Sequence, residues 1–371
     1  MADHILAIEA SSVELRLTLS KDGYPTVVHH TALPEARELL RASRALFDIS
    51  EGATPPTPVH LLSFGNDLAQ RLLGPLRSTL AGLFGRLWLV CPDSTWLDFP
   101  LELIPRRDGS FLIEGGRLSL RRAAHAPWPA YLEEIPRPKP APLRVVFLAG
   151  AFANEGVASP EKEQAFLDEL PSGTGAPLQI TCAESGTLQE LTELVARLQP
   201  HVVHLTGQLS IEHSTPRFSF RNASSPAVQD IPSLAATAFT GRGIGLVIVS
   251  GHETTPGAIG LASQALTVQG ATPLALGSPL PVGDYLATPF MESLYSHLAG
   301  GLGVDASLDH ARTELLADCL TQDWNGQKIL YPDFAQPRLY ATHSVDTLLG
   351  SARTSPNAQP NSRRAHLSPG Q

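Results

Sequence analysis

The second half of the chain alternates short apolar runs with amphipathic segments of helical period, and this pattern constrains the fold more than any other feature. Apolar runs that we predict to be strands lie at residues 143–148, 178–181, 201–205, 245–250 and 272–276. Helices are predicted between them at residues 159–170, 187–198 and 258–269. Nearly continuous apolar strands separated by helices are typical of a mostly parallel sheet that helices cover on both faces. We therefore predict an α/β fold.

The first part of the chain has a different pattern. Residues 5–8 and 13–19 alternate apolar and polar side chains, and a turn at Asp22-Gly23 leads to a third strand at 26–28, which favours antiparallel strands with one wet face. Helices are predicted at 34–47 and 65–84, and a buried strand at 87–91. These segments predict an N-terminal α+β subdomain.

A proline-rich stretch separates the two patterns. Six prolines lie within residues 127–142, and such a stretch is typical of a stiff, extended linker. We place the subdomains at residues 1–135 and 136–345 on this basis. Residues 346–371 are rich in Ser, Pro, Asn, Gln and Arg without an apolar period, so we predict a disordered tail there.

Charge and hydropathy exclude several classes of partner. The net charge is −9, and the predicted folded part has no Lys/Arg cluster, so we expect no nucleic-acid partner. No apolar run approaches the roughly 20 residues that span a bilayer, so we expect no membrane partner. The N-terminal residues 1–4 are acidic and lack the basic and apolar regions of a secretory signal. We therefore expect a cytoplasmic protein.

Nothing in the sequence predicts a cofactor or a metal. The cysteines at 91, 182 and 319 are too far apart to indicate a disulfide framework or a structural zinc site. The glycines of residues 241–245 precede a strand, whereas a phosphate-binding loop would lie between a strand and a helix. A zinc site built from His204, His252 and Glu253 remains an alternative on geometric grounds, although no pair of these ligands has the usual spacing.

In a parallel sheet, functional sites form beyond the carboxyl ends of the strands. The informative segments are therefore residues 204–209 (HLTGQL) and 249–254 (VSGHET), each of which follows a predicted strand.

These two segments resemble the motifs of CHAT domains, the bacterial relatives of caspases and separase. The histidine motif of that family has the form His-Φ-x-Gly-His-Gly, where Φ is apolar, and its cysteine motif has the form Leu-Ser/Asn-Ala-Cys-x-Thr/Ser. Further segments match in order, namely 90–94 with 98–103 as a hairpin, 183–187, 262–274, 290–301 and 324–340. The resemblance implies a caspase-like mostly parallel sheet flanked by helices, and a cysteine peptidase site.

The chain departs from the family at both catalytic positions. Gln208 stands where the family has its histidine, and His252 stands where it has the nucleophilic cysteine. A cysteine peptidase needs a thiolate to attack the carbonyl and an imidazole to move the proton, and glutamine does not titrate. We interpret the dyad as degenerate, with no intact catalytic residue. The residues that we predict to form a peptide-binding cleft are His204, Gly207, Gln208, Ser250, Gly251, His252 and Glu253.

The resemblance implies a role in a bacterial protease-based defence or cell-death module. The partner that we expect is a protein or peptide, such as an active paralogous protease or a sensor. One alternative is an active peptidase or hydrolase with a displaced nucleophile, either Ser250 with His204 or His252 as its base, or a free cysteine. Ser250 is expected to end its strand, which favours a structural role. A second alternative is an interaction module without a peptide cleft.

Overall fold

The structure is a computed structural model that describes residues 3–21, 24–47, 56–125, 138–152, 170, 177–222, 225–278, 287–321, 323–324, 327–343 and 345–350. Three sequence-based predictions therefore fall wholly or largely outside the described residues. These are the turn at Asp22-Gly23, the helix at 159–170, of which residue 170 alone is described, and the tail at 346–371 beyond residue 350.

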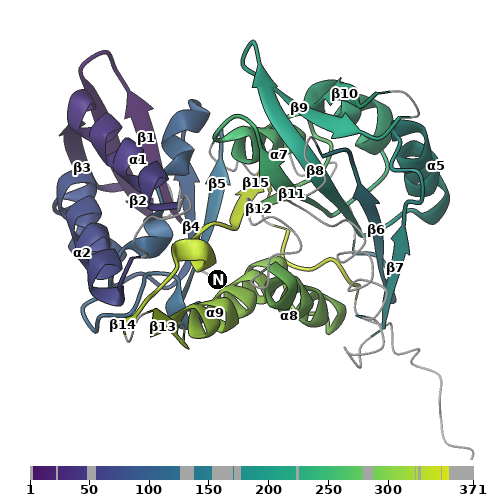
Figure 1. Cartoon of the computed structure of the whole chain (residues 1–371). Coiled ribbons are helices and arrows are strands. Elements are labelled where there is room, and N and C mark those ends of the chain that lie inside the picture. Colours follow the sequence, from purple (N-terminus) through teal and green to yellow (C-terminus); the bar gives the residue numbers. More distant parts are fainter. Residues whose placement is uncertain are drawn as a thin grey trace, which may run out of the picture.

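One twisted sheet runs through the molecule (Figure 1). Its strands lie in the order β7-β6-β8-β11-β12-β15-β5-β4-β1-β2-β3, and the hairpin partners β9 and β10 extend from the end of β8. Strands of the second half are β6 (Leu143–Ala149), β7 (Leu178–Cys182), β8 (Val202–Glu212), β9 (Thr215–Phe220), β10 (Ala227–Asp230), β11 (Leu246–Glu253), β12 (Leu274–Ser278) and β15 (Arg338–Ala341). Strands of the first half are β1 (Asp3–Ala10), β2 (Glu14–Lys21), β3 (Tyr24–Ala32), β4 (Gly85–Val90) and β5 (Leu118–Ala123). A separate pair, β13 (Asp323–Trp324) and β14 (Gln327–Lys328), is antiparallel.

Most neighbouring strands of this sheet are parallel, which confirms the predicted fold class. The parallel pairs include β6 with β7, β6 with β8, β8 with β11, and β11 with β12. Antiparallel pairing occurs at β12–β15, in the β8–β9–β10 hairpins and in the β1–β2–β3 meander. The meander was predicted from the alternating pattern of residues 5–28.

The sheet continues across the predicted boundary between the two subdomains. Strand β15 comes from the end of the described chain, and it pairs with β12 on one side and with β5 on the other. Because β15 lies between strands of both halves, they share one hydrogen-bonded sheet. Residues 126–137, where the boundary was placed, lie outside the described residues, so the boundary stays a prediction.

Helices cover both faces of the second half of the sheet (Figure 1). On one face α7 (Ala258–Val268), α5 (Leu188–Leu198) and the short α6 (Ile231–Leu234) pack against alternate strand residues such as Val247 and Val249. On the other face α8 (Ala287–Ala299) and α9 (Val304–Thr321) pack against Ile248 and Leu276. None of the helices in the described residues combines the length and apolar character that crossing a bilayer requires.

The first half of the chain differs from the sequence prediction in its helices. After α1 (Leu33–Phe47), the helix predicted at 65–84 is divided into α2 (Pro58–Leu68), a π-helical turn (Ala69–Leu73) and α3 (Leu76–Leu80). Gly74 has φ of 50°, and Pro75 removes a backbone donor, so the helix cannot continue through them. The segment that was expected to form a hairpin at 90–103 instead forms two short 3-10 turns, Ser94–Asp98 and Leu101–Leu103.

Buried ion pairs join α9 to strands of the first half. Asp305 on α9 accepts two hydrogen bonds from Arg121 on β5, at 2.8 Å and 2.7 Å. Arg122, the next residue of β5, donates two hydrogen bonds of 2.8 Å to Glu102, which also accepts one from Arg312 on α9. The side chains of Arg122 and Glu102 are completely buried. Charged groups therefore hold α9 against β5.

Candidate functional site

The two positions singled out by the sequence are neighbours in the sheet. Strands β8 and β11 are parallel, and His252 is the direct partner of Gln208 near the carboxyl ends of both strands. Neighbouring strands are about 4.8 Å apart, so the two side chains emerge next to each other. Gln208 is half-buried, and His252 is exposed. The structure thus brings together the residues that replace the histidine and the cysteine of the family motifs.

Two glycines let the strands approach closely just before this pair. Gly251 has φ of 126°, a backbone conformation that residues with a side chain rarely adopt. A Cβ atom at Gly251 would lie 2.1 Å from the carbonyl oxygen of Gly207. Gly207 in turn faces Phe218, whose ring would be 2.9 Å from a Cβ at that position. Glycine is therefore required at 251 for both its backbone angle and its contact with β8.

His204 and Ser250 lie deeper on the face of the sheet that α8 covers. The ring of His204 hydrogen-bonds through Nε2 to the hydroxyl of Ser250 and through Nδ1 to the hydroxyl of Tyr295, both at 2.9 Å. His204 and Ser250 are completely buried. Strand β11 continues to Glu253, so the expectation that Ser250 ends its strand is wrong. The strand extends because residues 250–253 keep pairing with residues 206–209 of β8.

The buried imidazole of His204 is expected to make the folded protein sensitive to acid. Burial lowers the pKa of His204 from 6.5 to about 3, so the folded protein keeps this ring neutral while the unfolded chain protonates it. Stability is therefore lost as the pH falls below 6.5, by roughly 2 kcal/mol from this group between pH 6.5 and 5. We expect His204→Asn to be less stable than the wild type at pH 7, but to lose less stability on acidification. Urea unfolding at pH 7, 6 and 5 measures the stability of the two proteins. If the free energy of unfolding falls equally with pH in both, the buried His204 ring is not the cause of the acid sensitivity.

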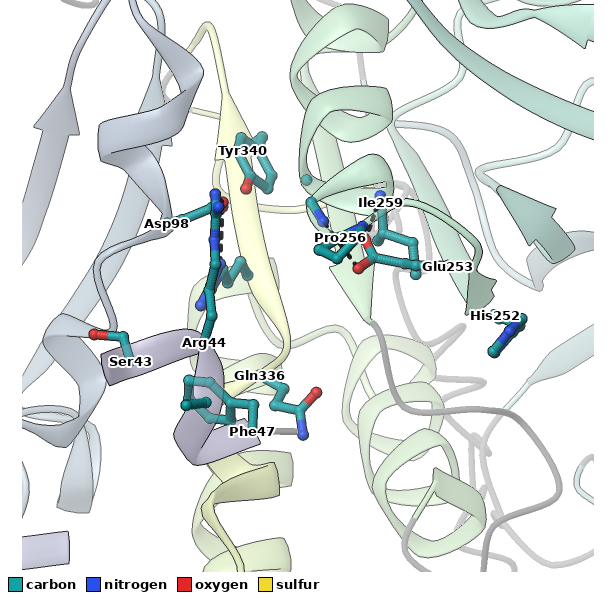
Figure 2. Close-up of a pocket in the computed structure, with 16 residues that line it drawn as sticks. Ser43, Arg44, Phe47, Asp98, His252, Glu253, Pro256, Ile259, Gln336 and Tyr340 are labelled. Carbon is teal, nitrogen blue, oxygen red and sulfur yellow. Dashed lines mark hydrogen bonds and ion pairs between the residues drawn. The ribbon is translucent and has the colours of Figure 1, made fainter. Parts of the chain in front are cut away.

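Glu253 points to the opposite face, toward the start of α7 (Figure 2). Its carboxylate accepts hydrogen bonds from the backbone N–H groups of Gly257 at 3.0 Å and Ile259 at 2.6 Å. Burial raises the pKa of Glu253, and these two hydrogen bonds oppose that rise. An anion is favoured at a helix N-terminus, so Glu253 holds the beginning of α7. The sequence signal for this role is Pro256-Gly257 directly before an apolar helical segment.

A cavity of about 630 Å³ opens beside the ends of β11 and β12. Asp98, at the end of a 3-10 turn, accepts hydrogen bonds of 3.0 Å from Arg44 of α1 and from Arg338 of β15. Figure 2 shows Arg44 and Asp98 together, Glu253 and Pro256 across from them, and His252 apart from this group. The cavity is also lined by Gly251, Tyr340 and Gln336.

Sequence reasoning missed Arg44, Asp98, Arg338 and Tyr340. They come from segments up to 296 residues apart in the numbering, and no motif links them. The arrangement exists because β15 is placed between the two halves of the sheet. Only the order of the strands could have predicted it.

No cysteine lies beside His252. Cys91 and Cys319 are buried, and burial raises the pKa of the Cys91 thiol to about 11, so it is not a thiolate at neutral pH. Cys182 is on β7, where it pairs with Phe147 of β6, and β6 separates it from β8. In the part of the chain that the structure describes, no three His, Cys, Asp or Glu side chains are grouped as metal ligands would be.

Comparisons with known proteins give one family and a set of similar structures. A family model described as the CHAT domain matches residues 62–361, which is most of the chain. No curated protein matches. The crystal structure of caspase-1 from Spodoptera frugiperda is 11% identical, with a TM-score of 0.33 and coverage of 59% of this chain and 93% of that one. The Drosophila initiator caspase Dronc is 12% identical, with a TM-score of 0.32 and coverage of 54% and 82%.

Proposed function

Because the chain belongs to the CHAT domain family, we propose that it is a pseudopeptidase, which binds a protein or peptide in a peptidase-like cleft without cutting it. The observation that carries this proposal is the pairing of Gln208 with His252 at the carboxyl ends of β8 and β11. The family's chemistry needs an imidazole and a thiolate at these two places. Here an amide and an imidazole occupy them.

The side chains present cannot replace the missing dyad. The Gln208 amide neither accepts nor delivers a proton near neutral pH, so it cannot activate a nucleophile or protonate a leaving amine. His252 has no titrating partner on the neighbouring strand, where Gln208 is its direct neighbour. Members of a catalytic unit act together, and the loss of either one removes most of the rate. The loss of both favours a function that depends on binding alone.

Binding would use the groups that the strand ends still present. The Gln208 amide offers both a donor and an acceptor, and the exposed His252 ring offers an apolar body with a polar edge. An extended peptide gains affinity from main-chain hydrogen bonds without any catalytic group. The partner that fits this role is a protein segment, such as part of an active paralogous protease or a sensor in a bacterial defence or cell-death module.

One observation favours a second candidate, a hydrolase with Ser250 as its nucleophile. The 2.9 Å hydrogen bond from Ser250 to His204 has the geometry of a nucleophile and its general base. Against it, both side chains are completely buried, so no substrate carbonyl reaches the hydroxyl. Burial also lowers the pKa of His204 to about 3, which makes it a weak base. A packing role for this pair explains the same contacts.

Restoring the dyad tests the proposal directly. We expect the double variant Gln208→His with His252→Cys to react with a thiol-directed peptide probe. Its rate should exceed that of His252→Cys alone by about 100-fold, because a general base contributes this much. The wild-type chain should cleave no member of a broad peptide library, while binding some members measurably by fluorescence polarisation. Mass spectrometry of the library measures cleavage, and mass spectrometry of the protein measures labelling by the probe.

Two further variants separate the alternatives. Ser250→Ala should leave the wild-type behaviour unchanged; cleavage by the wild type that this substitution abolishes would establish the hydrolase instead. Gln208→Ala with His252→Ala should weaken peptide binding. If partner binding survives that change unaltered, the chain is an interaction module that does not use the cleft.

A further inference from the structure

Two arginines of the cavity between α1, β15 and α7 use few of their hydrogen-bond donors. Arg44 and Arg338 share a single carboxylate, Asp98, with one hydrogen bond of 3.0 Å from each. Among the described residues, neither guanidinium has another hydrogen-bond partner. Each guanidinium carries five N–H donors and no acceptor. Most of the donors of this arginine pair are therefore unpaired.

The two arginines differ in burial in a way that suits a binding site. The side chain of Arg338 is only 16% exposed, and its Nε atom is buried without a hydrogen-bond partner. The side chain of Arg44 is 47% exposed, so this residue is open to solvent. A buried polar atom without a partner is unfavourable unless a ligand or water reaches it. Donors therefore remain unpaired on both arginines, inside the protein at Arg338 and toward solvent at Arg44.

Tyr340 and Glu253 are two further polar groups of the cavity lining. Tyr340 lines the cavity, and its hydroxyl makes no hydrogen bond within the described residues. Gly260 keeps the space beside that hydroxyl clear, because a Cβ atom there would lie 2.7 Å from it. Glu253 is the one other carboxylate of the lining, and both of its oxygens already accept from the backbone of α7. Its oxygens are therefore already used as hydrogen-bond acceptors and do not pair with the arginines.

We propose that this cavity is a binding site for a small oxyanion, a molecule that carries a phosphate or a carboxylate group. The group would be held by Arg44, Arg338 and the Tyr340 hydroxyl, beside Asp98. The two arginines share one hydrogen-bonded carboxylate, so most of their donors are left for the oxygens of a ligand. Charge-assisted hydrogen bonds to arginine suit phosphate and carboxylate oxygens in particular. The volume of about 630 Å³ is within the range of small-molecule sites.

The cavity adjoins the cleft, since His252 and Gly251 also line it, but the residues proposed to hold the anion are different ones. The ligand would contact α1 from the first half of the chain and β15 from its end, so it would connect segments that are distant in sequence. Binding is measured on the full chain without any peptide. If the pseudopeptidase proposal fails, anion binding in the cavity is still measurable. If no anion binds, the tests of peptide binding and cleavage are unaffected.

Anion titrations with matched variants test the site. Pyrophosphate represents phosphate ligands and citrate represents carboxylate ligands, each at an ionic strength held constant with sodium chloride and followed by calorimetry. We expect at least one of the two probes to bind saturably. The probe that binds more tightly shows whether the site takes a phosphate or a carboxylate group. Arg44→Gln should weaken binding about tenfold or more. Arg41→Gln is the control, because this exposed arginine is one turn away on α1 and does not line the cavity.

Removing the carboxylate of Asp98 is expected to strengthen anion binding, whereas Arg44→Gln weakens it. Asp98→Asn removes the carboxylate that both arginines share, so this variant should be less stable, and the anion should raise its melting temperature more than that of the wild type. If the variant does not fold, the Arg44→Gln comparison decides alone. Absence of saturable binding to the wild type would overturn the proposal. Equal affinity of the wild type and Arg44→Gln would overturn it as well.

Discussion

Replacing Arg122 with methionine is expected to lower the free energy of unfolding by about 3–5 kcal/mol, because it leaves the buried carboxylate of Glu102 without its main partner. Arg122 donates two hydrogen bonds to Glu102, and it also donates to the carbonyl oxygens of Leu97 and Phe99. All four acceptors lose a donor in the variant. Denaturant unfolding at pH 7 measures the loss. The exposed Arg16→Met, at a surface ion pair with Glu9, is the control and should change stability by less than about 1 kcal/mol.

The pH dependence of this variant identifies the cause. Burial on its own would raise the pKa of Glu102, but the charges of Arg122, Arg312 and Arg338, together with the hydrogen bonds from Arg122, hold that pKa below its usual value. The wild type therefore gains stability from this pair above the ordinary carboxyl pKa and loses it as the pH falls. In the variant burial dominates, and Glu102 is stabilised by taking up a proton. The difference between the two proteins should be largest at pH 7 and shrink toward pH 4.5. A difference that does not change with pH would show that lost packing is responsible.

Replacing Gly251 with alanine is expected to destabilise the fold by about 3 kcal/mol and to disturb the candidate site. The new methyl group would overlap the carbonyl oxygen of Gly207, and φ of 126° is unfavourable for alanine in any surroundings. The strands must separate locally, which moves His252 away from Gln208. Thermal unfolding measures the first effect. The second effect is measured by adding Gly251→Ala to the restored dyad, Gln208→His with His252→Cys, and comparing probe labelling.

Gly270 provides a matched control for this substitution. It also has a positive φ, of 68°, but a Cβ atom there would meet nothing within 4 Å. Gly270→Ala should therefore cost only the backbone strain, about 1 kcal/mol. If the two alanine variants are equally stable, the close approach of β8 and β11 does not contribute to the requirement for glycine.

Much of the fold of the second half could be predicted from the sequence, because its strands are apolar runs separated by amphipathic helices. The strands at 143–148 and 178–181 and the helix at 187–198 agree with β6, β7 and α5 to within a residue or two. Strand β5 was missed because its LSLRRA sequence contains two arginines, which normally mark a surface. Those arginines are buried by ion pairs with α9 and with Glu102. A sequence pattern does not show such distant partners.

The candidate site was predictable in one part and hidden in another. Gln208 and His252 could be placed together, because each follows a strand of a parallel pair. The orientation of Glu253 could not be anticipated, because β11 continues three residues beyond its predicted end at Ser250. Side chains alternate along a strand, so its length decides which face each residue meets. Predicting the cavity would also have required knowing that β15 lies beside β5.

The position of β15 sets the order in which the molecule can be completed during synthesis. The first half of the chain leaves the ribosome with β5 present, but the strand that pairs with its open edge is not made until residues 338–341. Arg121 waits almost as long for its partner on α9, Asp305. An unpaired strand edge and a buried cation without its counter-ion are unstable and prone to aggregate. The nascent first half therefore depends on rapid arrival of the last strand, and slow translation between the two would favour misfolding.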